Sequence, residues 1–147
     1  MKQSAKSIVN IMRGCNLAMV INHLPGEVAL RISQLERVSK KLLEPIPDVL
    51  DKIEKDFESR ISATDNANEI EKLNAEKAQA IENVYSAEYT LDIAPFKASD
   101  FFAKRTIRYV VSIPGDKKPK QEITEIPEGQ SLVPPMFFSL MGDFITE

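Results

Sequence analysis

The longest amphipathic stretch of this 147-residue chain, residues 26–61, reads GEVALRISQLERVSKKLLEPIPDVLDKIEKDFESRI. Its apolar residues recur every three or four positions, the spacing that places side chains on one buried face of a helix. Pro45 and Pro47 interrupt the stretch, because proline lacks a backbone donor and clashes with the preceding helical turn. We therefore expect either one helix that bends at Pro45 or two helices in series, with one shared apolar face.

A second amphipathic run, residues 66–87, follows a polar loop at 62–66. Asn66 with Glu69 three residues later has the form of a helix start. The two runs most simply form an antiparallel helical hairpin that is kinked at Pro45. Helical spacing leaves the inward residue undecided at two points, which are Val38 or Ser39 and Val49 or Leu50.

Residues 4–23 predict a helix before the hairpin. Ile8, Cys15 and other apolar residues recur there at helical spacing, and the Pro25-Gly26 turn pair should end the helix. Asparagines and an arginine interrupt the apolar run, so we expect no signal peptide. The sequence has no stretch of about 18 apolar residues, so we expect no membrane partner.

The last third of the chain, residues 88–147, favours strands. Tyr89 to Ile93 alternates apolar and polar residues, and TIRYVVSI at 106–113 is the stretch richest in β-branched and aromatic residues. Residues 122–126 alternate in the same way and are expected to return as the partner strand of a hairpin. MFFSLMGDFI at 136–145 follows two prolines and predicts a helix that docks on the rest.

These patterns predict a single domain, residues 1–147, of the α+β class and mainly α. It would consist of an N-terminal helix, a kinked antiparallel helical hairpin, a small β element and a C-terminal docking helix. Residues 1–87 form the helical part, and residues 88–147 form the strand-containing part with the C-terminal helix. A chain of this length buries enough surface to fold without metals or disulfides.

The composition offers few of the residues and motifs from which catalytic sites are built. A single cysteine, Cys15, excludes an internal disulfide, and a single histidine, His23, is too few for a His-based metal site. The five glycines stand apart and form no phosphate-binding loop. The carboxylates alternate with lysines on the expected outer helix faces, as solvated side chains do. We expect no catalytic site, no metal and no cofactor, and the free thiol fits a reducing cytoplasm.

The sign of the charge alternates along the chain: +4 over residues 1–47, −7 over 48–92, +5 over 93–120 and −5 over 121–147. The simplest explanation is that oppositely charged segments face each other across the fold or across a contact between copies.

The positive block suggests nucleic-acid binding as an alternative function. Its candidate basic patch consists of Lys97, Lys104, Arg105, Arg108, Lys117, Lys118 and Lys120. Against this alternative, Arg108 and Tyr109 are adjacent on the expected strand and therefore point to opposite faces, which prevents them from stacking on the same base.

The expected C-terminal helix is apolar around most of its circumference, so it needs cover on more than one side. It is either buried within the domain or packed against another subunit or partner. The candidate protein-interaction residues are Met136, Phe137, Phe138, Leu140, Met141, Phe144 and Ile145. We predict a non-catalytic protein-protein interaction protein that associates through apolar helical faces, with itself as a homo-oligomer or with another protein.

The order of parts resembles that of small accessory proteins of tailed bacteriophages. The likeness consists of a short helix ending at Leu24-Pro25, a long charged hairpin, the LDI segment at 91–93 and the closing LVPPMFFSLMGDFI at 132–145. It spans most of the chain and is one of layout. It implies a role in the virion, in assembly or on a host protein, in the cytoplasm of a bacterial host or in the virion, and it transfers no site residues.

Overall fold

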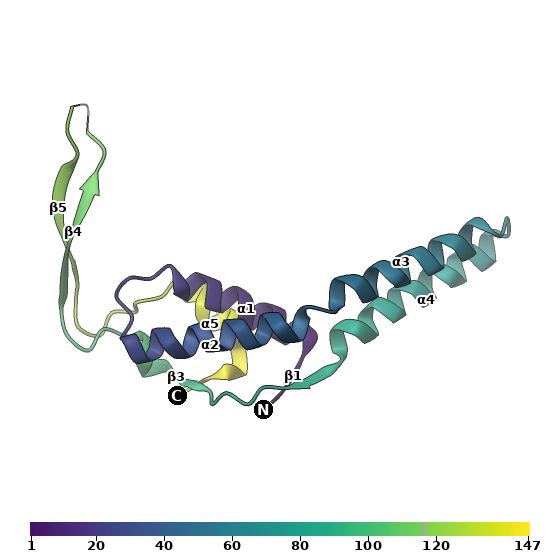
Figure 1. Ribbon diagram of the computed structural model, residues 1–147, viewed down its shortest axis with the longest axis horizontal. Coiled ribbons are helices and arrows are strands. Elements are labelled where there is room, and N and C mark those ends of the chain that lie inside the picture. Colours follow the sequence, from purple (N-terminus) through teal and green to yellow (C-terminus); the bar gives the residue numbers. More distant parts are fainter. Residues whose placement is uncertain (116) are drawn as a thin grey trace.

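The computed structural model describes residues 1–115 and 117–147. A central helical body carries two arms that project from its opposite ends, a helical arm and a β-hairpin (Figure 1). The expected class, α+β and mainly α, is confirmed, because helices dominate and the strands form three sheets of two strands each in the described residues.

The body is built around helices α1 (Ala5–Met19) and α2 (Gly26–Leu43), which pack side by side (Figure 1). Ser4 caps α1, because its Oγ accepts a hydrogen bond from the backbone N–H of Ser7 at 3.1 Å. The apolar stripes of both helices meet in the core, where Ile8, Ile32 and Leu35 are fully buried. The expected N-terminal helix is thereby confirmed.

Helix α5 (Pro135–Met141) covers a second side of α1 and is followed by a 3-10 turn, Gly142–Phe144. Gly14 allows the two helices to approach closely, since a Cβ at this position would lie 2.8 Å from Met141 Sδ. The rings of Phe101 and Phe137 also pack here, with centroids 4.6 Å apart. The expected C-terminal docking helix is present and docks within the chain.

The helical arm consists of α3 (Ile46–Ser62) and α4 (Ala67–Ser86). Of the two alternatives at Pro45, the structure has two helices in series, and Pro45 occupies the position just before α3. Asn66 caps α4, as its sequence position predicts, by accepting a hydrogen bond from the N–H of Asn68 at 2.9 Å. The hairpin is shorter than the sequence suggests, because α2 packs on α1 in the body and only α3 pairs with α4.

Two small sheets close the body. Strand β1 (Lys2–Ser4) pairs antiparallel with β2 (Glu88–Thr90), which ties the N-terminus to the end of α4. Strand β3 (Phe96–Lys97) pairs in parallel with β6 (Ile145–Thr146), and a 3-10 turn, Ala98–Phe101, follows β3. The sequence pattern predicted β2 but not β1.

The projecting β-hairpin consists of β4 (Ile107–Ile113) and β5 (Lys120–Ile126). The strands are antiparallel, with a register that runs from Ile107 opposite Ile126 to Ile113 opposite Lys120. This hairpin is the one expected from the two alternating segments. In the described part of the chain, no helix is both long and apolar enough to cross a lipid bilayer.

Candidate functional site

The molecule exposes more surface than a compact chain of its mass. Its accessible surface is 10,219 Å². A compact 16.5 kDa monomer is expected to expose about 7,600 Å², so the excess is about 2,600 Å². The two projecting arms explain the excess, because neither is covered by the body over its outer length (Figure 1).

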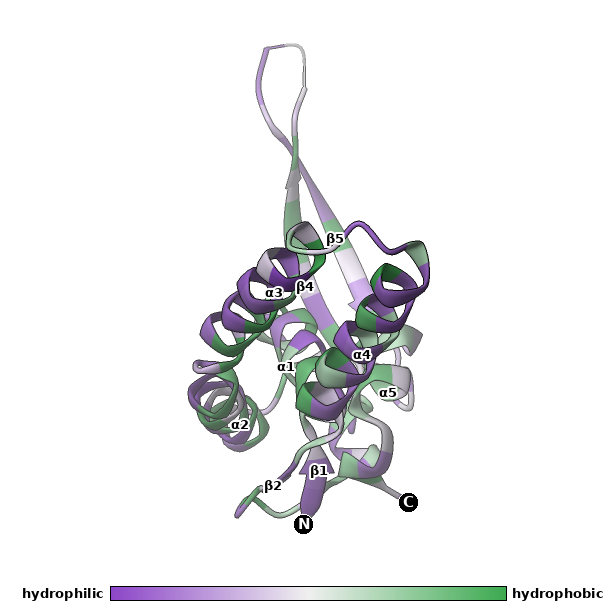
Figure 2. Ribbon diagram, turned by 90° about the vertical axis from the view of Figure 1, so that its right-hand side faces the viewer, coloured by the Kyte–Doolittle hydropathy of each residue, from purple (hydrophilic) through white to green (hydrophobic). Residues whose placement is uncertain are grey.

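The β-hairpin carries apolar side chains without a layer to cover them. Its register places Val110 opposite Ile123 on one face, and these side chains are 59% and 76% exposed. Figure 2 shows hydrophobic residues interspersed with hydrophilic ones on the strands of the hairpin as it rises above the helices. An isolated two-stranded hairpin is at best marginally stable in water. Binding to another molecule would therefore cover the exposed apolar surface of this hairpin and stabilise it.

The base of the hairpin is anchored to the body. The ring of Tyr109 packs on His23 in the turn between α1 and α2, with centroids 4.3 Å apart. On the other face, Arg108 Nε lies 2.6 Å from Glu125 Oε1 across the two strands. Beyond this anchor, Val111 and Ile113 lie on the Tyr109 face and are 36% and 37% exposed. We call residues 110–113 and 120–123 the distal hairpin.

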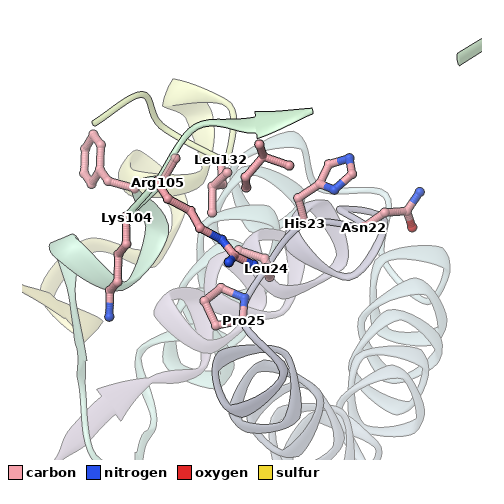
Figure 3. A pocket seen from close by; sticks show the side chains of 10 residues that line it. Asn22, His23, Leu24, Pro25, Lys104, Arg105 and Leu132 are labelled. Atoms are coloured by element: carbon pink, nitrogen blue, oxygen red, sulfur yellow. The ribbon is translucent and has the colours of Figure 1, made fainter. Parts of the chain in front are cut away.

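A shallow pocket of about 380 Å³ lies where the hairpin meets the body. Asn22, His23, Lys104 and Arg105 supply its polar groups, and Leu132 is among its apolar ones (Figure 3). Arg105 extends toward Leu24 and Pro25, whereas Lys104 points away from them. Among the described residues its lining contains no carboxylate, so the pocket lacks the paired carboxylates of a glycosidase-type site.

The single cysteine and the single histidine occupy different environments. Cys15 is fully buried in α1, and burial, with a smaller contribution from the negative charge of Glu36, raises its pKa from 9.0 to about 12. His23 lies instead at the base of the hairpin, against Tyr109. A thiol that stays protonated at neutral pH is a poor nucleophile. In the described residues, no group of three or more His, Cys, Asp or Glu side chains is placed to hold a metal ion.

The structure divides the C-terminal candidate residues between core and surface. Phe137, Met141 and Phe144 are at most 1% exposed, so they are core residues of this chain and offer no interaction surface. Phe138, Leu140 and Ile145 are half-buried, and Met136 is 63% exposed. Of the two alternatives for this helix, the structure shows burial within the domain.

The seven basic candidates lie in four separate places. Lys97 belongs to β3. Lys104 and Arg105 line the pocket where the hairpin meets the body, and Arg108 is paired with Glu125 on the hairpin itself. Lys117, Lys118 and Lys120 are exposed at the far end of the hairpin. The seven-residue strand β4 separates Lys104 and Arg105 from the three lysines at the far end by about 23 Å. The structure therefore does not gather these residues into one continuous patch.

Sequence reasoning placed the interaction surface on the C-terminal helix and did not single out Val110 and Ile123. A signal was present, because TIRYVVSI carries apolar residues on both strand faces while only one further strand follows it. Two strands cannot bury both faces of such a segment.

Comparisons with protein-family models, with curated proteins and with solved structures find no match for this chain.

Proposed function

We propose that the chain is a non-catalytic protein-binding protein and that the distal hairpin is its contact surface. The observation that carries this proposal is the Val110–Ile123 pair, which is highly exposed on an element that has no covering layer. Apolar side chains exposed together on a projecting element are typical of protein interaction sites.

The backbone of the hairpin supports the same function. In a two-stranded sheet each strand has one edge without a partner, and such an edge offers N–H and C=O groups to an added strand of another protein. The excess surface of about 2,600 Å² also exceeds the roughly 800 Å² that a standard interface buries on each partner. A role as a phage accessory or assembly factor fits a binding protein with two projecting arms and is part of this proposal.

Photo-crosslinking in cells in which the protein naturally occurs tests the proposal. The full chain carries benzoylphenylalanine at Ser112, an exposed position on the same face as Val110 and Ile123. The control chain carries it at Asn16, an exposed position on α1. We expect protein adducts, with a second copy or with another protein, mainly from position 112.

A further variant tests whether the crosslinks depend on the apolar pair Val110 and Ile123. The variant V110T/I123T preserves β-branched side chains and thus the strand preference, while it removes apolar surface. We expect its adducts from position 112 to fall severalfold. Equal adduct yields from positions 112 and 16, or a yield unchanged by V110T/I123T, would contradict the proposal.

The alternative function, nucleic-acid binding through residues 97–120, has an independent test. Phosphate contacts would make binding of labelled DNA or RNA fall steeply between low and high salt. We expect no such binding, because the basic side chains are divided among four places and Arg108 is paired with Glu125. Tight, salt-sensitive binding that is lost in a K117Q/K118Q/K120Q variant would replace protein binding as the proposed function.

A further inference from the structure

We infer that the pocket where the hairpin meets the body binds a small molecule that carries one carboxylate or phosphate group on an apolar body. The lining of this pocket comes from three parts of the chain, which are the turn at 22–25, the segment at 102–107 and Leu132. The inference goes beyond protein binding and does not rest on the distal hairpin, because no described residue of the distal hairpin lines the pocket.

Backbone hydrogen bonds hold the walls of the pocket in place. The N–H of Ala103 donates to the carbonyl of Gln130 at 2.8 Å, and the Ala103 carbonyl accepts from the N–H of Gly129 at 2.7 Å. The N–H of Leu132 donates to the carbonyl of Phe101 at 2.7 Å. Two lining segments that are far apart in the sequence are thereby tied together. A ligand would enter a site that is already formed and would not have to order it, which favours binding.

One side of the pocket is apolar. Ala103 and Leu132 are buried, and Leu24, Phe102 and Ile107 are half-buried. A ligand with an apolar body would cover the parts of these side chains that still face solvent. The volume of about 380 Å³ lies at the lower end of the range for small-molecule sites, so the ligand is small.

The other side of the pocket is positively charged. The Arg105 side chain extends across the pocket toward Leu24 and Pro25, whereas Lys104 borders the pocket and points away from them (Figure 3). Neither cation forms an ion pair with a residue that the structure describes. A guanidinium presents parallel N–H donors that match two oxygens of a carboxylate or phosphate group. One guanidinium serves one such group, so the site suits a single anionic group.

Neighbouring acidic side chains leave this charge uncompensated. Glu27 and Glu128 are close in sequence to the lining segments, but both are exposed and neither lines the pocket. Asp100 is engaged elsewhere, because its carboxylate accepts a hydrogen bond from the N–H of Lys97 at 3.1 Å and lies 4.0 Å from the guanidinium of Arg31. An anionic group of a ligand would therefore supply the partner that Arg105 lacks within the described chain.

Nuclear magnetic resonance titration of the ¹⁵N-labelled full chain tests the site. The probes are benzoate and phenyl phosphate, which combine a ring with one anionic group. We expect saturable shifts of the backbone N–H signals of His23, Ala103 and Arg105, with a Kd of about 1 mM or lower for the better probe, and no shifts in the distal hairpin. The probe that binds more tightly identifies the anionic group.

Matched probes separate the two halves of the ligand. Benzyl alcohol keeps the ring and lacks the charge, so we expect it to bind at least about tenfold more weakly than the better anionic probe. Acetate and inorganic phosphate keep the charge and lack the ring. We expect each to bind more weakly than its ring-bearing counterpart, because the apolar side of the pocket stays uncovered.

Substitutions of Arg105 assign the binding to its guanidinium. We expect R105Q to weaken binding of the better probe about tenfold, because a charge-assisted hydrogen bond is lost. R105K keeps the charge without the paired donors and should fall between R105Q and the unmodified chain. Arg105 is exposed, so the spectra outside the pocket should stay unchanged. The control K117Q/K118Q/K120Q removes three distant lysines and should bind like the unmodified chain.

Four outcomes would overturn the inference. They are the absence of saturable shifts at the pocket, R105Q binding as tightly as the unmodified chain, an uncharged or ringless probe binding as tightly as its counterpart, and an equal loss of binding in K117Q/K118Q/K120Q. Failure of the crosslinking from position 112 would instead contradict the proposed function and leave this site in place.

Discussion

Cys15 shows how burial changes the chemistry of one residue. The thiol lies in the α1 core with no exposed surface, and its thiolate would lose hydration there and face the negative charge of Glu36. Both effects favour the protonated form and raise the pKa to about 12, whereas a smaller backbone hydrogen-bond effect lowers it. Its function is therefore that of a small apolar core residue.

This raised pKa makes stability depend on alkaline pH. The folded thiol keeps its proton up to about pH 12, whereas an unfolded thiol loses it near 9.0. The unfolded state thus binds fewer protons above pH 9, so the free energy of unfolding falls as pH rises. Between about pH 8 and 10 we expect the parent to lose about 1.4 kcal/mol more than a C15A variant, measured by urea unfolding. Parallel pH profiles would contradict the assignment.

Ser39 shows where helical spacing is insufficient to choose a residue. The pattern allowed either Val38 or Ser39 to face inward, and hydrophobicity favours valine. The structure buries Ser39 completely and leaves Val38 37% exposed, because the stripe through Ile32, Leu35 and Leu43 continues at position 39. The Ser39 hydroxyl has no hydrogen-bond partner in the described structure. Tertiary packing of α2 on α1 therefore overrides the hydrophobicity of one position.

At the scale of elements, α5 provides a matched pair of substitutions. Phe137 is fully buried against Phe101, and its neighbour Met136 is 63% exposed. We expect F137A to lower the free energy of unfolding by about 3–5 kcal/mol, because it leaves a cavity in the core. We expect M136A to change it by less than about 0.5 kcal/mol. Urea unfolding of both variants measures the difference, and similar values would mean that α5 does not dock as described.

The helix break near Pro45 is decided by local sequence, whereas the packing partner of each helix is not. Proline excludes a continuous helix for reasons of backbone chemistry, so the interruption is visible in the sequence. The partner of each helix is not local, because α1, α3 and α4 all present apolar stripes that α2 could cover. The structure pairs α2 with α1 and α3 with α4, which shortens the predicted hairpin.

At the scale of the whole molecule, the two arms predict an extended shape in solution. A compact chain of 147 residues has a radius of gyration of about 15 Å. We expect small-angle scattering of the monomer, at a salt concentration of about 0.5 M to limit charge contacts, to give a clearly larger value. A radius near 15 Å would mean that the arms fold back on the body.

The sequence alone determined the properties that depend on short-range chemistry. Helix spacing, proline breaks, the Asn66 cap and β-branched alternation identified the helices, the β4–β5 hairpin and the docking helix, because each reflects backbone preference or the side chains of near neighbours. The tertiary structure decided which apolar surfaces cover each other. It buried Phe137 and Phe144 in the core and left Val110 and Ile123 exposed, although all four are apolar residues in apolar segments. Burial depends on contacts between residues far apart in the chain, and local spacing carries no information about those contacts.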